Sequence, residues 1–72
     1  MLEPKYVTLG RLVESFSHSF GRIVEISWSR MRFGVKFSYS DTIHQYSVED
    51  LQGLKVYDDS ETHYVNQEKL HG

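Results

Sequence analysis

The segment from Met31 to Tyr39 alternates between apolar and polar residues at every position. Its odd-numbered residues are Met, Phe, Val, Phe and Tyr, whereas its even-numbered residues are Arg, Gly, Lys and Ser. A period of two is typical of a β-strand that has one face in a core and the other in water. The flanking segments 22–28 and 42–46 also have strand composition. We therefore expect an antiparallel sheet that is built around residues 31–39.

The segment before this sheet contains three further signals. Residues 15–21 alternate serine with larger side chains and end in Gly21. This favours an irregular loop whose hydroxyls bond their own backbone and whose phenylalanines lie at the tips. Ile23 and Val24 are adjacent apolar residues, so the alternation slips once, as it does at a β-bulge or where both faces of a strand are partly covered. Residues 5–14 are rich in strand formers but are interrupted by Gly10, which predicts a bent first strand.

The second half of the chain predicts several short elements. Ser47 is followed three residues later by Asp50, which is typical of a helix N-cap with an acidic partner. Because Gly53 follows so soon, we expect only a single 3-10 turn at this place. Residues 54–57 and 62–65 have strand composition and flank an acidic turn at 58–61. The expected fold is all-β, with about five antiparallel strands and one short 3-10 turn.

A chain of 72 residues is long enough for one domain, which we place at residues 1–72 with a core from about 5 to 66. So small a domain is marginally stable alone, and the absence of cysteine excludes disulfides and thiolate metal sites. Association of several copies is the remaining source of stability, so the sequence leaves a homo-oligomer open. No apolar run approaches a membrane span, and the N-terminus lacks a signal-peptide pattern. We expect a cytoplasmic protein that does not enter a membrane.

The expected order of elements is similar to that of a known superfamily. Two long strands joined by a hairpin follow a loop with aromatic tips and precede a strand that ends in a single turn. Over roughly residues 8–57 this order resembles the SH3-like small β-barrels. That superfamily includes Tudor-type chromatin modules, ribosomal barrels and plasmid-encoded type II dihydrofolate reductases. The resemblance implies a single small barrel of about five antiparallel strands.

The leading functional hypothesis concerns aromatic residues that could line one mouth of such a barrel. SH3-like folds use a cluster of this kind as a groove for peptides, although aromatic rings also form much of any small core. We predict a small non-catalytic module that binds a protein partner of unknown identity, through the loop around 16–20 and the strand face at Trp28. The predicted protein-binding residues are Phe16, Phe20, Trp28, Tyr46 and Tyr57.

The alternative hypothesis is single-stranded nucleic-acid binding by a basic strand face. Bases stack on aromatic rings while phosphates pair with guanidinium groups. Against this, the formal net charge is −2, whereas nucleic-acid-binding domains are usually basic. Residues 1–40 hold six basic and three acidic residues, and residues 41–72 hold two and seven, so the charge is divided along the chain. The predicted nucleic-acid-binding residues lie beside Trp28 and are Arg22, Arg30, Arg32 and Lys36.

A third hypothesis, from a different class, is an oligomeric enzyme similar to the type II dihydrofolate reductases. Residues 21–24 (Gly-Arg-Ile-Val) and 43–51 (Ile-His-Gln-Tyr-Ser-Val-Glu-Asp-Leu) resemble two segments of that family. Tyr46 matches the family's tyrosine, but His44 replaces its glutamine and Gln45 replaces its isoleucine. The lysine that those enzymes carry before the loop is missing from residues 13–15, which read Val-Glu-Ser. This activity is therefore the least favoured of the three.

The remaining chemistry of the sequence is unremarkable. The histidines show none of the spacings of a metal site, and no Ser/His/Asp set can be argued from the abundant serines. The sequence therefore predicts no metal, no cofactor and no catalytic residue. The four histidines are His18, His44, His63 and His71.

Overall fold

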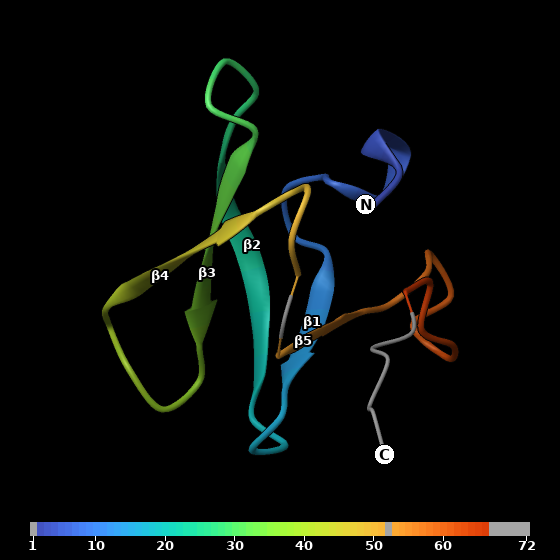
Figure 1. Ribbon diagram of the computed structural model, residues 1–72. Helices are drawn as coiled ribbons and strands as arrows, with labels where there is room; N and C mark the ends of the chain where they lie inside the picture. Colours follow the sequence, from blue (N-terminus) through green and yellow to red (C-terminus); the bar gives the residue numbers. More distant parts are fainter. Residues whose placement is uncertain (1, 52, 67–72) are drawn as a thin grey trace.

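The computed structural model describes residues 2–51 and 53–66, which form one antiparallel sheet that curls into a half-barrel (Figure 1). The order of strands across the sheet is β4-β3-β2-β1-β5. The all-β class, the five antiparallel strands and the single short 3-10 turn are confirmed, and the architecture is compatible with an SH3-like barrel. The elements are the 3-10 turn η1 (Pro4–Tyr6) and the strands β1 (Leu12–Ser15), β2 (Phe20–Ser27), β3 (Arg32–Phe37), β4 (Ile43–Ser47) and β5 (Leu54–Val56).

The two longest strands, β2 and β3, pair with each other and contain the predicted bulge. Ile23 lies opposite Val35. The next pair is Glu25 and Gly34, so Val24 is an extra residue without a partner on β3, and its side chain is exposed. A bulge bends its strand and increases the local twist. The slip in the sequence pattern therefore marks a place where the sheet curls.

The hydrophobic core lies inside this curl. The alternation along β3 places Phe33, Val35 and Phe37 in the core, as predicted. Tyr39 departs from the pattern and is 61% exposed, because β3 ends at Phe37 and the tyrosine ring then lies on the Phe37 ring with centroids 5.5 Å apart. The buried apolar residues are Leu2, Val7, Val13, Ile23, Phe33, Val35, Phe37, Val48, Leu54 and Val56.

The 3-10 turn lies near the N-terminus and not after Ser47, where it was expected. Pro4 occupies its first position, and the Val7 N–H closes the turn on the Pro4 carbonyl at 3.0 Å. At Ser47 the hydroxyl makes the predicted kind of capping contact, whereas Asp50 takes part through its backbone. The Glu49 N–H donates to Ser47 Oγ (3.1 Å) and the Asp50 N–H donates to the Ser47 carbonyl (3.3 Å). The described residues do not continue these bonds into a helical turn, so the predicted position was wrong.

Two of the expected strands are shorter in the structure. β1 begins at Leu12 and not at residue 5, because Gly10 takes a left-handed φ of 85° that turns the chain. In the segment 62–65 only a single bridge, between Tyr57 and Tyr64, is present. The Asp58 carboxylate accepts backbone hydrogen bonds from the residues that follow it and holds them as a loop.

Replacement of Gly21 by alanine tests why a glycine opens β2. A Cβ at this position would lie 2.8 Å from the Lys36 carbonyl oxygen and 2.9 Å from atoms of Phe37 and Val35, and the backbone oxygen cannot move aside. We expect Gly21→Ala to lower the free energy of unfolding by about 2–3 kcal/mol in urea titrations followed by tryptophan fluorescence. Gly10→Ala meets open space and should cost only about 1 kcal/mol, from its left-handed φ. An equal loss in the two variants would contradict this account.

Candidate functional site

Glu14 is a buried carboxylate on the outer face of the sheet. Its neighbour Val13 is in the core, so Glu14 points outward, yet only 6% of its surface is exposed. Two phenols donate to the same oxygen, Glu14 Oε1: the Tyr57 OH at 3.1 Å and the Tyr64 OH at 2.6 Å. The His18 Nδ1 lies 3.2 Å from the other oxygen, Oε2. The carboxylate therefore ties β1 to the loop that follows it and to the segment that follows β5.

These hydrogen bonds change the acidity of the groups that make them. The Tyr64 hydroxyl, by donating to the carboxylate, is the largest cause of a lowered pKa at Glu14, and the His18 and Tyr57 contacts act in the same direction. Burial alone would raise the pKa of Glu14, so the donors outweigh it. In turn, the bond to Glu14 raises the pKa of Tyr64. Glu14 is thus held as the anion and Tyr64 as the neutral donor.

Three rings form a continuous aromatic surface beside Glu14, which we define as Phe20, Tyr57 and Tyr64. The ring centroids of Phe20 and Tyr57 are 6.3 Å apart, and those of Tyr57 and Tyr64 are 4.6 Å apart. Phe20 is 45% exposed and Tyr64 is 42% exposed. The Lys55 Nζ lies 4.8 Å from the Tyr64 ring centroid. The surface therefore presents accessible rings, and the hydroxyls of its two tyrosines are fixed by their hydrogen bonds to Glu14.

The loop between β1 and β2 lies next to this surface. As predicted, serine hydroxyls hold it: the Ser19 N–H donates to Ser15 Oγ at 3.2 Å. Phe16 is exposed at the loop, where its N–H donates to the Gly53 carbonyl at 3.2 Å. Phe20 lies within β2 and not in the loop as expected, because it pairs with Glu14 across the β1–β2 ladder.

The structure does not gather all five predicted aromatic residues. It brings Phe20 and Tyr57 together, but Trp28 lies just beyond the other end of β2, at the tip of the β2–β3 hairpin, where it is 46% exposed (Figure 1). Tyr46 lies on β4 with its ring stacked on the core residue Phe33 at 5.9 Å, and burial raises its pKa. The five rings therefore do not line one mouth: Phe16 and Phe20 are exposed near the β1–β2 loop, and Trp28 is exposed at the β2–β3 hairpin.

Glu14 and Tyr64 are the members of this site that sequence reasoning missed. The hydrogen bonds from Tyr57 and Tyr64 to Glu14 span 43 and 50 residues of sequence. No local pattern encodes contacts of that separation. The one available signal is that Glu14 lies next to Val13 in a strand, which places its carboxylate on the face opposite the core.

The four predicted cationic residues fall into two pairs. Arg22 is neutralised by Glu61, whose Oε2 lies 2.6 Å from its Nη1, and Lys36 lies 3.6 Å from Asp41. Arg30, at the tip of the β2–β3 hairpin, and Arg32, at the start of β3, are exposed, and their guanidinium groups make no hydrogen bond or ion pair with any described residue. The hairpin tip next to Trp28 therefore keeps its free positive charge, whereas the strand face further along β2 does not.

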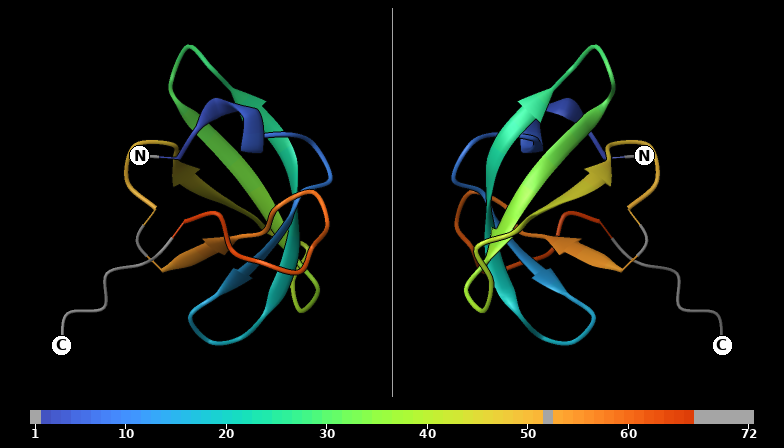
Figure 2. Two further views of the ribbon diagram at one scale, coloured as in Figure 1. Left: turned by 90° about the vertical axis from the view of Figure 1, so that its right-hand side faces the viewer. Right: turned by 90° about the vertical axis from the view of Figure 1, so that its left-hand side faces the viewer.

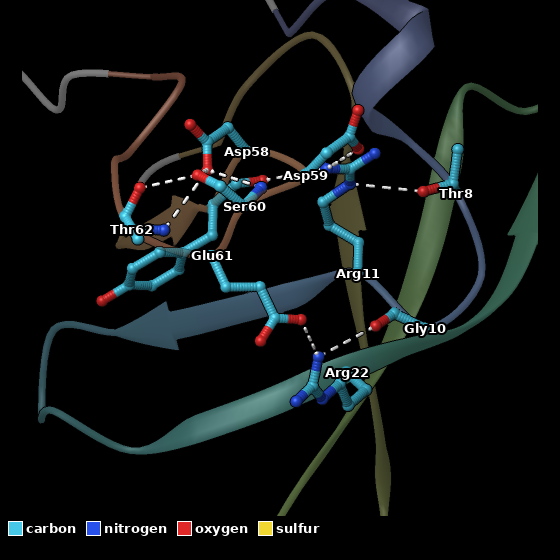
Figure 3. A network of polar contacts seen from close by, with 10 residues as sticks. Thr8, Gly10, Arg11, Arg22, Asp58, Asp59, Ser60, Glu61 and Thr62 are labelled. Atoms are coloured by element: carbon cyan, nitrogen blue, oxygen red, sulfur yellow. Dashed lines mark hydrogen bonds and ion pairs between the residues drawn. The ribbon is translucent and has the colours of Figure 1, made fainter.

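A second polar network joins the two oppositely charged halves of the chain (Figure 3). Arg11 is buried, and its Nη1 lies 2.7 Å from Asp59 and donates to the Tyr57 carbonyl at 3.3 Å. Its Nε donates to Thr8 Oγ1 at 3.2 Å. With the Arg22–Glu61 pair, these contacts place the acidic segment 58–61 against basic residues of the first half. Folding therefore interleaves the two charged halves and does not leave them as separate surfaces.

The segment His44-Gln45-Tyr46 does not converge on one site within the chain. Gln45 points to the outer face, where its Nε2 donates to Glu25 Oε1 at 2.6 Å. His44 points inward, and its ring meets the Phe37 ring edge-on with centroids 5.4 Å apart. Its Nε2 is buried and has no hydrogen-bond partner among the described residues.

The described part of the chain holds neither a metal-binding cluster of side chains nor a helix that could span a membrane. Residues 2–51 and 53–66 contain no group of three or more His, Cys, Asp or Glu side chains that could hold a metal ion. Within the same residues no helix is long and apolar enough to cross a membrane. His63 is exposed, and His71 lies outside the described residues.

No family model matches the chain, and neither a curated protein nor a solved structure shows significant similarity to it. Its function must therefore be inferred from the arrangement of its own side chains.

The Glu14 carboxylate gives the fold a specific dependence on pH. Because its folded pKa lies below the ordinary value of 4.5, its contribution is complete above that value and is lost as the pH falls through the folded pKa. We expect Glu14→Gln to lower the free energy of unfolding at neutral pH by about 1–3 kcal/mol. The variant should also lose less stability than the wild type between neutral pH and the acid range. Glu3→Gln removes the charge of an exposed carboxylate that makes no capping bond, and should follow the wild type.

Urea unfolding at a series of pH values checks this expectation. An acid dependence in Glu14→Gln that equals that of the wild type would show that the carboxylate does not couple to folding.

Proposed function

We propose that the chain is a small non-catalytic interaction module of the SH3-like type, which binds a segment of a protein partner on the aromatic surface of Phe20, Tyr57 and Tyr64. The observation that carries this proposal is that Phe20 and Tyr64 are exposed, while a buried carboxylate holds the hydroxyls of Tyr64 and of the half-buried Tyr57. An exposed tyrosine in a small domain is ordinary. Two tyrosines whose hydroxyls share one oxygen of Glu14 form a built surface.

Rings that are already fixed are suited to binding, because little side-chain conformational entropy remains to be lost when the partner binds. Immobilising a side chain at an interface costs about 0.5–1.5 kcal/mol, and the bonds to Glu14 remove much of that cost in advance for Tyr57 and Tyr64. Tyrosine is enriched among the residues that dominate binding energy, since it offers a large ring at low conformational entropy. The three rings therefore provide a preorganised anchor site.

The surroundings of the rings favour an extended segment with apolar side chains. The Glu14 carboxylate is already satisfied by its donors, so it is not available to a basic partner group. Charged groups of both signs contact the rings: Lys55 lies over the Tyr64 ring, and Glu14 accepts from the hydroxyls of Tyr57 and Tyr64. Packing against the rings, and not charge, would supply the affinity, as it does where aromatic grooves bind extended peptides.

A pair of matched variants tests this function. Phe20 and Trp28 are exposed to 45% and 46% and lie at opposite ends of β2. Peptides selected from a random displayed library on the wild-type chain serve as the probe, and titration calorimetry gives their affinities. We expect Phe20→Ser to weaken binding at least about ten-fold, because it removes an anchor ring, and Trp28→Ser to leave it unchanged.

Circular dichroism confirms that both variants are folded. Failure to select any peptide, or equal binding by wild type and Phe20→Ser, would refute the aromatic surface as the binding site. Loss of binding in Trp28→Ser alone would move the site to the hairpin.

The second candidate function, single-stranded nucleic-acid binding, is favoured by the hairpin tip. Trp28 is exposed there beside Arg30 and close to Arg32, two guanidinium groups without a described partner. A ring on which a base can stack, next to cations that can meet phosphates, is the minimal arrangement for this binding. The contribution of Arg22 and Lys36 is reduced because each has a carboxylate partner.

Binding of a fluorescent oligothymidine at low salt measures this second candidate. We expect Arg30→Ala/Arg32→Ala to weaken binding by about ten-fold and to reduce its salt dependence, since two phosphate contacts are lost. Arg22→Ala removes a charge that Glu61 already neutralises and should change the affinity by less than about two-fold. Absence of wild-type binding at low salt, or equal effects of the two variants, would exclude the hairpin as the site.

A further inference from the structure

The sheet has two edge strands, β4 and β5, and the outward backbone groups of the two strands differ in their hydrogen bonding. Figure 2 shows both edge strands on the same side of the curled sheet, where they do not pair with each other. An edge strand presents unpaired N–H and C=O groups that can accept another strand, and natural proteins usually protect such edges. The state of each edge therefore indicates where a further strand can add.

The edge of β5 is sealed by the segment that follows it. The Asn66 side chain spans two residues of the strand: its Oδ1 accepts from the Val56 N–H at 2.6 Å, and its Nδ2 donates to the Leu54 carbonyl at 2.8 Å. The Val65 N–H also donates to the Val56 carbonyl at 2.8 Å. The outward backbone groups of β5 are thus satisfied within the chain.

The edge of β4 is open along its outward residues. The Val48 N–H donates to the Met31 carbonyl, so the alternation of an antiparallel ladder turns the backbone groups of His44 and Tyr46 toward β3. The N–H and C=O groups of Ile43 and Gln45 then point away from the sheet, as does the Ser47 N–H. No described strand lies on that side of β4.

None of the usual protections of an edge strand is present in β4. Its five residues, Ile-His-Gln-Tyr-Ser, include no proline and no Lys, Arg, Asp or Glu. Its register with β3 is continuous over all five pairs, so no bulge turns the edge away. Two exposed apolar side chains, Ile43 and Tyr39, flank its first end. The edge is therefore regular in register, uncharged and partly apolar.

We infer that β4 is the contact between two copies of this chain, which pair antiparallel about a two-fold axis at Gln45. In this register Gln45 faces Gln45 of the second copy, and Ile43 faces Ser47 of the second copy. The two Gln45 residues then exchange both backbone hydrogen bonds, and the Ser47 N–H donates to the Ile43 carbonyl. The amide of glutamine donates and accepts, which makes the central pair self-complementary. A contact of this kind is isologous and closes at two copies.

The backbone groups of β4, and not its charges, support a second copy as the occupant, because its own β4 presents the same outward N–H and C=O groups in the reverse order. Beyond the strand ends, the same register places Glu49 of one copy opposite Asp41 of the other. Lys36, the present partner of Asp41 at 3.6 Å, offsets one of these two carboxylates at each end. The heterologous alternative, β4 on β5 of another copy, is opposed by the Asn66 seal.

The variant Gln45→Lys is designed to weaken the dimer while it leaves the fold of the single chain intact. Within one copy the lysine still lies beside Glu25, which now accepts from Gln45. Across the two-fold axis it places like charges directly opposite one another, which destabilises a strand pair. Sedimentation of the full chain over about two orders of magnitude in concentration should show a monomer–dimer equilibrium. We expect Gln45→Lys to raise its dissociation constant at least about ten-fold.

Ser29→Lys, an equal charge change at the exposed hairpin tip, should leave the dimer intact, and circular dichroism shows whether each variant is folded. Gln45→Pro is a second variant, because it removes an N–H that the ladder to β3 does not use. It too should abolish the dimer. A monomer at every concentration, or a dimer that survives both changes at Gln45, would overturn the inference. So would a monomer whose Ile43 and Gln45 amides gain protection from exchange only when an extended foreign peptide is added.

Discussion

The pairing of β2 with β3 is the contact on which the rest of the sheet depends. These strands are the longest, and every other strand is attached to one of them directly or through β1. Their register is fixed at one end by Gly21, where any side chain would meet the backbone of β3, and is shifted once at Val24. The bulge bends the sheet so that its inner face can enclose a small core. A domain of this size has few other means to bury apolar surface.

Much of this architecture can be read from the sequence because it is local. The alternation along β3, the slip at Val24 and the serine-rich loop each depend on neighbours within a few residues. Local reasoning failed where tertiary contacts decide the conformation. The Ser47 hydroxyl makes a capping bond, but the chain then has to cross to β5, and the described residues form no helical turn there. Residues 62–65 have strand composition, but the edge that they would have extended is occupied by a side chain, Asn66.

The candidate site could be predicted only in part, for the same reason. Phe20 and Tyr57 were identified as aromatic residues with a possible common surface, and they do meet. What organises them is Glu14, a residue without a distinctive sequence context, together with Tyr64, which lies 50 residues away in the chain. A carboxylate acquires this role only when folding removes it from water and supplies donors in the same step. The composition also predicted two halves of opposite charge. The ion pairs of Arg11 with Asp59 and of Arg22 with Glu61 neutralise charges from both halves.

The seal that Asn66 forms on β5 limits how far such a sheet can grow. A chain with two open edges adds copies at both and extends without end, as fibrils do. The contacts of Asn66 and Val65 close one edge of the described sheet, so the pairing at β4 inferred above would leave no open edge strand among the described residues. In that pairing these three hydrogen bonds on β5 would distinguish a finite assembly from a filament.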